Sequence, residues 1–342
     1  MIATGGLLGY AALLLAAGPL LARARWPERA PRLAIAVWLA VAASAIGSVV
    51  LAGLVLLVPA PTVSRGAAWL LATCGMALRV RYAHPGGLPL AGAGAVVAAA
   101  LVARVAWCAV ATLTATARAG RDHRLRLQLA GRTDERLGAL VVEHGEPAAY
   151  CMSGVRRPVV LTTAALRLLD EPQLAAVLAH ERAHQAGRHH LLVSLAAVPA
   201  AAFPWVPAFR HASVEVARLA ELAADDAAAR RSPRLAVAEA LLTLGSVASP
   251  AAAWALGAGG STAAARVRRL IAAPQPLSWA AKTTWTVALA ALIALPLLLM
   301  AAPAFGAVGQ HRGSPHVHGA WVRLWERPAA VSHPRLLGPH PG

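Results

Sequence analysis

The chain has 342 residues, of which 58% are hydrophobic and 14% are charged, and its mean hydropathy is +0.57. In soluble domains about a quarter of the residues are charged, so this composition argues against a soluble protein and indicates a membrane protein. The formal net charge is +17. Because the arginines gather beside apolar segments and no nucleic-acid-binding motif accompanies them, we expect basic loops at a membrane surface and no direct nucleic-acid binding.

Four apolar segments are long enough to cross a lipid bilayer as helices. They cover residues 2–21, 33–58, 91–114 and 284–303. Arginines are concentrated in particular stretches beside these apolar segments. Cytoplasmic loops of membrane proteins are enriched in Lys and Arg, so we expect those stretches to face the cytoplasm and the chain to be a multi-pass protein of a bacterial inner membrane. The expected organisation is a three-span membrane region (1–116), a cytoplasmic domain (117–283), a last transmembrane helix (284–303) and a disordered Pro/His-rich tail (304–342).

Three short segments in the cytoplasmic domain are typical of β-strands. Residues 137–143, 148–153 and 157–163 are enriched in Val, Tyr and Thr and are bounded by Gly or Pro. We predict that they form a small sheet. Its edge could pair with an extended peptide, although a purely structural sheet is the simpler alternative.

The segment L-L-D-E-P-Q-L-A-A-V-L-A-H-E-R-A-H, which begins at Leu168, predicts a helix of about four turns. Asp170 is a favourable N-cap residue, and Pro172 suits the first turn. Gln173 completes the spacing of a capping box. The apolar positions that follow recur at helical spacing, so a well-defined amphipathic helix is expected here.

This helix carries an H-E-x-x-H motif formed by His180, Glu181 and His184. Two histidines four residues apart leave the same face of a helix, so both imidazoles can bind one metal ion. A catalytic zinc has about three protein ligands and one open position. We therefore predict one Zn²⁺ per chain, with Glu181 as the general base that activates water and then protonates the leaving amine.

The third metal ligand has two candidates. Residues 180–190 also fit the longer pattern H-E-x-x-H-x-x-G-x-x-H, in which His190 would be the ligand, but that pattern requires a methionine turn downstream. The only later methionine lies inside the last span, so we favour Glu221 and interpret His189 and His190 as a polar boundary. Asp225, one turn beyond Glu221, could accept the free ring N–H of a ligand histidine.

The choice of Glu221 constrains how the chain is threaded through the membrane. Residues 191–209 are apolar but contain three prolines. If this segment crossed the membrane completely, Glu221 would lie on the opposite side from the H-E-x-x-H motif. We therefore expect a re-entrant apolar hairpin that returns to the same side.

Together, the three N-terminal spans, the segment from Val159 to Leu192, the hairpin and the sequence E-L-A-A-D-D-A-A resemble the BlaR/MecR antirepressor metallopeptidases. They also resemble the wider clan of HtpX and CAAX prenyl protease peptidases, whose pattern is H-E-x-x-H followed by E-x-x-x-D. The resemblance implies zinc bound by His180, His184 and Glu221, with Glu181 catalytic. Residues 304–342 are too short for the penicillin-binding sensor domain of BlaR-type proteins and lack an S-x-x-K motif, so β-lactam sensing is not expected.

The expected fold is thus a mainly α membrane protein with about four transmembrane helices. A cytoplasmic gluzincin-like zinc protease domain carries the small β-sheet and the re-entrant apolar hairpin. The expected activity is that of a metalloendopeptidase in contact with the bilayer and with a protein or peptide substrate. A BlaI-like transcriptional repressor is the substrate that the BlaR branch implies, and misfolded membrane proteins are the HtpX-like alternative. An intramembrane site-2-type protease and a non-catalytic membrane signalling scaffold are two further interpretations of the sequence.

Overall fold

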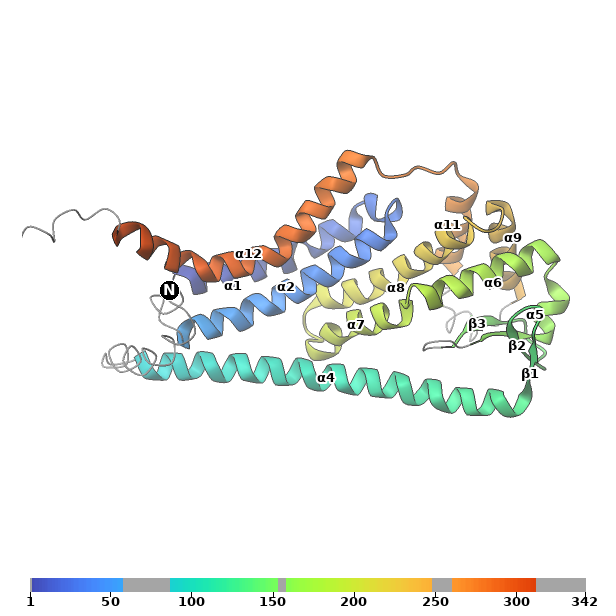
Figure 1. Cartoon of the computed structure of the whole chain (residues 1–342), viewed down its shortest axis with the longest axis horizontal. Coiled ribbons are helices and arrows are strands. Elements are labelled where there is room, and N and C mark those ends of the chain that lie inside the picture. Colours follow the sequence, from blue (N-terminus) through green and yellow to red (C-terminus); the bar gives the residue numbers. More distant parts are fainter. Residues whose placement is uncertain (1, 58–86, 153–157, 248–259, 312–342) are drawn as a thin grey trace, which may run out of the picture.

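The computed structural model describes residues 2–57, 87–152, 158–247 and 260–311, and these residues are mainly helical. Helices α1, α2 and α12 lie side by side, while α4 runs along the length of the molecule (Figure 1). All four are long and apolar enough to cross a membrane, which confirms that the four predicted segments are helices of sufficient length. Their bounds are Ile2–Arg23 (α1), Pro31–Leu57 (α2), Gly87–Ala130 (α4) and Trp279–His311 (α12).

Two of these helices are longer than the sequence predicts. The third predicted span ends at residue 114, but α4 continues to Ala130, because Arg, Leu and Ala dominate the added turns and are good helix formers. Helix α12 runs to His311, so the first residues of the predicted tail are helical, and the rest of that tail lies outside the described residues. The extension of α4 connects its apolar part directly to the sheet (Figure 1).

Close contact between α2 and α4 depends on two glycines. A Cβ atom added to Gly53 would lie 2.6 Å from the carbonyl oxygen of Gly94, which is too close for any side chain. Small residues at such crossings allow helix backbones to approach each other within a membrane. The two helices therefore form a closely packed pair.

The predicted small sheet is present and has one strand more than predicted. Strands β2, β3 and β4 fall within the three predicted segments, while β1 escaped prediction because its sequence G-R-T-D is polar. The strand order is β1-β2-β4-β3, with β2 parallel to β4 and the other two pairs antiparallel. This order leaves β3 at an edge, where it contacts α6. The strands cover Gly131–Asp134 (β1), Ala139–Val142 (β2), Ala149–Cys151 (β3) and Val159–Thr162 (β4).

Helix α6 (Glu171–Ala186) follows a short helix α5 (Thr163–Leu168) and begins as the sequence predicts. The Asp170 carboxylate accepts a hydrogen bond from the Gln173 backbone N–H at 2.8 Å, and the Gln173 side chain accepts one from the Asp170 N–H. Val177 and Leu178 pack against buried residues of the sheet. The cap and this apolar face together fix the position of the H-E-x-x-H motif.

The apolar segment that was expected to form a hairpin does reverse direction. Helix α7 (His189–Ala202) is followed by a short turn, and α8 (Pro207–Ala228) runs back beside α7 toward α6 (Figure 1). Pro199 is accommodated inside α7, and Pro207 occupies the first turn of α8, where its missing N–H is not needed. The prolines therefore lie close to the turn between the two helices and do not interrupt either helix.

The tip of this hairpin is attached to α4 by Arg104. Its Nε donates a hydrogen bond to the carbonyl oxygen of Ala202 at 2.5 Å, and its guanidinium lies 5.3 Å from the ring centre of Trp205. An arginine within an apolar helix must find polar or aromatic partners. Arg104 thus has a structural partner at the end of α7.

The remaining helices pack around α6 and α8. Helix α9 (Arg234–Val247) contacts α6, and α11 (Gly260–Ile271) packs on α9 and α8. The core between α2, α7 and α8 includes the fully buried Val216 and Leu219 of α8 and Trp38 of α2. Helix α8 is therefore held between a membrane-spanning helix and the H-E-x-x-H helix.

Candidate metal centre

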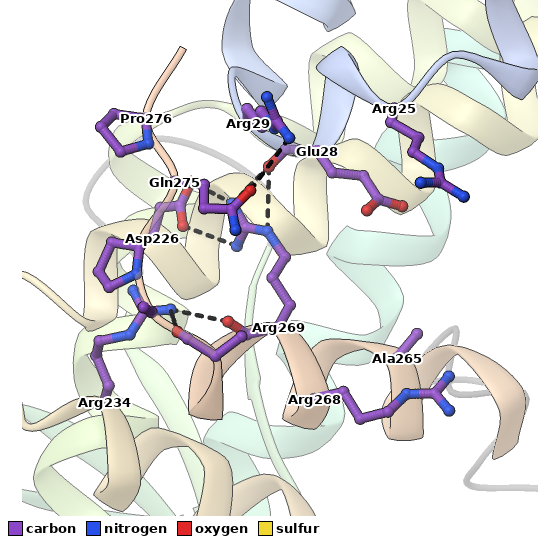
Figure 2. Close-up of a pocket in the computed structure, with 13 residues that line it drawn as sticks. Arg25, Glu28, Arg29, Asp226, Arg234, Ala265, Arg268, Arg269, Gln275 and Pro276 are labelled. Carbon is purple, nitrogen blue, oxygen red and sulfur yellow. Dashed lines mark hydrogen bonds and ion pairs between the residues drawn. The ribbon is translucent and has the colours of Figure 1, made fainter.

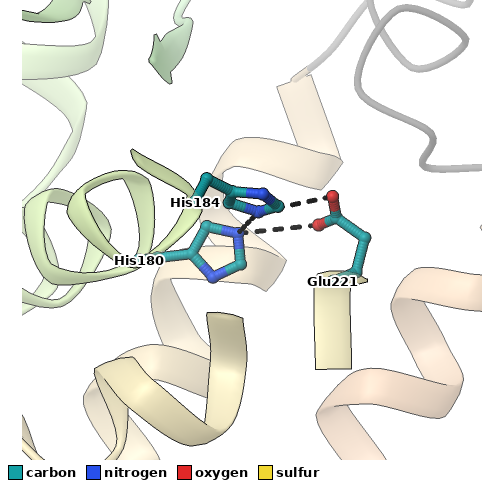
Figure 3. Close-up of side chains that lie close together, drawn as sticks. All are labelled: His180, His184 and Glu221. Carbon is teal, nitrogen blue, oxygen red and sulfur yellow. Dashed lines mark hydrogen bonds and ion pairs between the residues drawn. The ribbon is translucent and has the colours of Figure 1, made fainter. Parts of the chain in front are cut away.

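Two helices bring three side chains of ligand type together (Figure 3). Helix α6 presents His180 and His184, and α8 presents Glu221. The two Nε2 atoms lie 3.1 Å apart, and the Glu221 oxygens lie 3.5 Å from Nε2 of His180 and 3.4 Å from Nε2 of His184. Ligands about 2.0–2.1 Å from a tetrahedral zinc ion lie about 3.3 Å from one another. Oε2 of Glu221 lies beside His180 and Oε1 beside His184, so the two imidazoles and the carboxylate group fit around one zinc ion.

The ring nitrogen of His180 that faces away from this centre is opposed by a carboxylate. Oδ1 of Asp225, one turn beyond Glu221 on α8, lies 3.1 Å from Nδ1 of His180. Asp225 is completely buried. A carboxylate in this position fixes the orientation of a ligand histidine and leaves Nε2 to the metal. Asp225 thus faces His180 from one turn beyond Glu221.

Arg266 of α11 binds both acidic residues, a role that the sequence did not reveal. Its guanidinium donates two hydrogen bonds to Asp225, at 2.8 and 2.7 Å, and its Nη1 lies 3.0 Å from Oε2 of Glu221. In the sequence, Arg266 is only one member of a basic cluster. A usable signal was present, because Arg266 lies four residues before the buried Leu270 and so shares the apolar face of α11.

His189 is the second residue whose role was misjudged. It was expected to be a polar boundary, but it is buried, with 3% of its surface exposed, and its Nδ1 lies 3.1 Å from Nδ1 of His184. The tight turn between α6 and α7 turns its ring inward, because Arg188 adopts a left-handed conformation (φ 49°). A Cβ at Gly187 would collide with the His189 ring. The packing of His189 therefore explains why residue 187 is a glycine, and the longer metal motif is not needed to explain it.

His190, the alternative third ligand, is not part of this group. Among the described residues, the set that could hold a metal consists of His180, His184 and Glu221. His190 follows His189 at the start of α7, while Glu221 comes from the opposite helix of the hairpin. Glu221 remains the predicted third ligand, and His190 remains the alternative.

The carboxylates make this centre favourable for a cation. Burial alone would lower the pKa of His180, but the carboxylates of Asp225 and Glu221, 3.1 and 3.5 Å from its ring nitrogens, raise the pKa to about 10. A metal ion bound at Nε2 would displace the proton from that nitrogen. Burial would raise the pKa of Glu221, yet His180 and the Arg266 charge lower it to about 2. Burial lowers the pKa of His184 to about 4, so its ring is neutral and able to bind a metal near neutral pH.

Glu181 points from α6 toward the edge strand of the sheet. The Cys151 thiol on β3 donates a hydrogen bond to its carboxylate, and burial together with the Glu181 charge raises the pKa of that thiol to about 12. Burial also raises the pKa of Glu181 itself. A carboxylate whose pKa is shifted upward toward neutrality is a better general base than an ordinary one. Cys151 marks the point where β3 and the H-E-x-x-H helix meet.

The fold and the site together define a class of protein. An H-E-x-x-H helix joined by a glutamate from a second helix, with a small sheet beside it, is the arrangement of a membrane-associated metallopeptidase. The family model of peptidase family M48 matches residues 123–341, and the chain belongs to this family. M48 peptidases are zinc-dependent, and the donor set found here fits zinc. Comparison with curated proteins and with solved structures gave no significant match.

Removing the charge of Asp225 is expected to weaken zinc binding. The Asp225→Asn variant keeps the size of the side chain but loses the carboxylate that opposes His180, so zinc affinity should fall by about 10–100-fold. Affinity can be measured by competition with a chromogenic chelator. Asp226→Asn is a matched control, because Asp226 pairs with Arg269 and not with His180. Equal losses in the two variants would contradict a positioning role for Asp225.

Proposed function

We propose that this M48 peptidase is a zinc-dependent endopeptidase in which His180, His184 and Glu221 bind the metal. The observation that carries the proposal is the spacing of their three ligand atoms, which all lie within 4.8 Å of one another. Glu181 is the general base, because it follows the first ligand on the same helix and because burial raises the pKa of its carboxyl group, which makes the carboxylate a stronger base.

The edge strand β3 provides a binding place for an extended peptide. In the part of the chain that the structure describes, β3 pairs with β4 alone, so its other edge can accept a further strand. Main-chain hydrogen bonds would give such a peptide affinity without demanding a particular sequence. Because Cys151 of β3 contacts Glu181, a peptide added to this edge would pass beside the general base. Binding through the middle of an extended chain favours an endopeptidase.

The residues of the site divide the chemistry among themselves. A zinc ion held by His180, His184 and Glu221 would lower the pKa of a water molecule toward about 7 and would polarise the scissile carbonyl group. Glu181 takes a proton from water and delivers it to the amine that leaves. Asp225 holds the ring of His180, and Arg266 holds both Asp225 and Glu221. A buried arginine that pairs with two carboxylates keeps them ionised, so Glu221 stays ready to bind the metal.

The proposal also includes the side of the membrane that the site faces and the identity of the natural substrate. The arginines that precede α2 and follow the apolar part of α4 support a site that faces the cytoplasm of a bacterial inner membrane. A soluble regulator such as a BlaI-like repressor is the substrate suggested by the resemblance to the BlaR group. A damaged membrane protein, as for HtpX, is the alternative. Both substrates would present an unfolded segment to β3.

Removal of the metal tests the proposed activity directly. Purified protein in detergent should cleave an unstructured protein such as casein at internal bonds, which mass spectrometry of the products identifies. Treatment with a chelator should abolish cleavage, because the open metal position is needed for water, and added zinc should restore it. Cleavage that persists after complete metal removal, or release of terminal residues only, would contradict the proposal.

A further inference from the structure

A basic cavity of about 720 Å³ lies where the α1–α2 connection meets α8, α9 and α11 (Figure 2). The connection contains a short 3₁₀ helix (Trp26–Glu28, η1). Two carboxylates, those of Glu28 and Asp226, line the cavity. Against them stand the five arginines Arg25, Arg29, Arg234, Arg268 and Arg269, which leaves a net formal charge of +3.

The two carboxylates of the cavity already have partners. Arg269 binds Asp226 at 2.8 and 2.9 Å, and it also donates to the backbone carbonyl of Glu28. The Glu28 side chain is bound by Arg218 at 3.0 Å, outside the cavity. Arg234 donates to the last carbonyls of α11. These contacts hold the lining residues of the cavity in place, and they neutralise both of its carboxylates.

Arg234 is held by backbone carbonyls alone, and three further arginines of the cavity have no carboxylate partner among the described residues. Arg29 binds only the neutral side chain of Gln275, at 3.1 Å. Arg25 and Arg268 have no hydrogen bond or ion pair within the described part of the chain, and in Figure 2 both guanidinium groups lie on the same side of the cavity. Arginine forks of this kind bind phosphate oxygens in bidentate fashion. The cavity therefore suits a phosphate group.

An apolar groove of about 520 Å³ begins at the same connection. It lies between α1, α2 and α12, and its lining is almost entirely apolar, with Leu14, Leu21 and Leu292 among its residues. Trp26 and Trp285 also line it and stack with their ring centres 4.0 Å apart. Tryptophans are enriched at the boundary between lipid headgroups and acyl chains, so this stack indicates the level of that boundary.

The chain connects the cavity and the groove through two adjacent residues. Arg25 lines the basic cavity, and Trp26 lines the apolar groove. A ligand that fills both must carry an anionic phosphate at one end and hydrocarbon at the other. We propose that the protein binds one anionic phospholipid, with its phosphate among Arg25, Arg29 and Arg268 and an acyl chain in the groove.

Such a lipid would contact the helix that supports the metal centre. Helix α11 carries Arg268 and Arg269 at the cavity and Arg266 at Glu221 and Asp225. Asp226, which lines the cavity, is the neighbour of Asp225 on α8. Binding of the lipid would hold α11 against the α1–α2 connection and so stabilise the position of Arg266.

The first test compares lipid binding by the full chain with and without the free arginines. The protein is placed in phosphatidylcholine nanodiscs containing an increasing fraction of phosphatidylglycerol, and bound lipid is counted by native mass spectrometry. The double variant Arg25→Gln/Arg268→Gln should bind phosphatidylglycerol roughly 30-fold more weakly, the equivalent of about 1 kcal/mol for each arginine. The charge-matched control Arg136→Gln/Arg167→Gln removes two exposed arginines far from the cavity and should bind as the parent does. Equal affinity in the two double variants would overturn the proposal.

A second variant separates a lipid from a soluble phosphate compound. Ala291→Trp fills the groove from α12 and leaves every arginine of the cavity in place. If the ligand is a lipid, this variant should also lose phosphatidylglycerol, and inorganic phosphate should not compete with the lipid in the parent protein. Unchanged lipid binding by Ala291→Trp, or displacement of the lipid by millimolar inorganic phosphate, would assign the cavity to a soluble anion and overturn the proposal.

Discussion

Replacing Glu181 by Gln is expected to remove peptide hydrolysis while leaving zinc content unchanged. The substitution keeps the shape of the side chain but removes its ability to accept a proton, and general base catalysis contributes about 10²–10⁴-fold to such rates. The new amide side chain would not disturb the proposed ligands, because Glu181 points toward Cys151 and not into the set formed by His180, His184 and Glu221. Cleavage of casein and metal analysis of the same preparation measure the two quantities.

The matched control for this variant is Glu171→Gln. Glu171 is an exposed residue in the first turn of α6, so its replacement changes the same atoms on the same helix, away from the site. The control should retain both zinc and activity. If Glu181→Gln cleaves casein at a rate within a few-fold of the parent rate, another group must act as the base. The raised pKa of Glu181 would then play no part in catalysis.

Local sequence signals predicted the parts of the fold that depend on local physics. The four apolar helices follow from length and hydropathy, and α6 begins at Asp170 because the capping box is encoded in neighbouring residues. The return of α8 to the H-E-x-x-H helix was inferred from a chemical requirement, namely that Glu221 must reach the metal centre. The first two features need no knowledge of distant residues, whereas the return of α8 was inferred by combining the H-E-x-x-H motif with the distant Glu221.

Features that depend on distant partners could not be predicted in this way. Strand β1 has a polar sequence and exists because β2 pairs with it. Arg266 reaches the metal centre from α11, 41 positions beyond Asp225. Its place on the apolar face of α11 indicates burial but does not identify its two carboxylate partners. His189 is turned inward by the left-handed backbone at Arg188, a conformation that is uncommon for arginine. In each case tertiary packing, rather than local preference, decides the outcome.

The most decisive expected result concerns the third metal ligand. Glu221→Ala should lose almost all bound zinc, because two histidines alone leave a zinc ion without the three protein ligands of a catalytic site. His190→Ala should retain about one zinc ion per chain, since His190 lies outside the set of His180, His184 and Glu221. Metal content of detergent-purified protein measures both, and circular dichroism confirms that each variant remains helical.

The opposite outcome would change the interpretation of the whole hairpin. If His190→Ala lost zinc and Glu221→Ala kept it, the metal would be held entirely by residues from α6 and the start of α7. Glu221 would then pair with Arg266 as a structural ion pair, and the return of α8 would no longer be needed for metal binding. Loss of zinc in Glu221→Ala alone would instead mean that the apolar hairpin is part of the catalytic apparatus, because only the reversal between α7 and α8 brings that carboxylate back to the H-E-x-x-H helix.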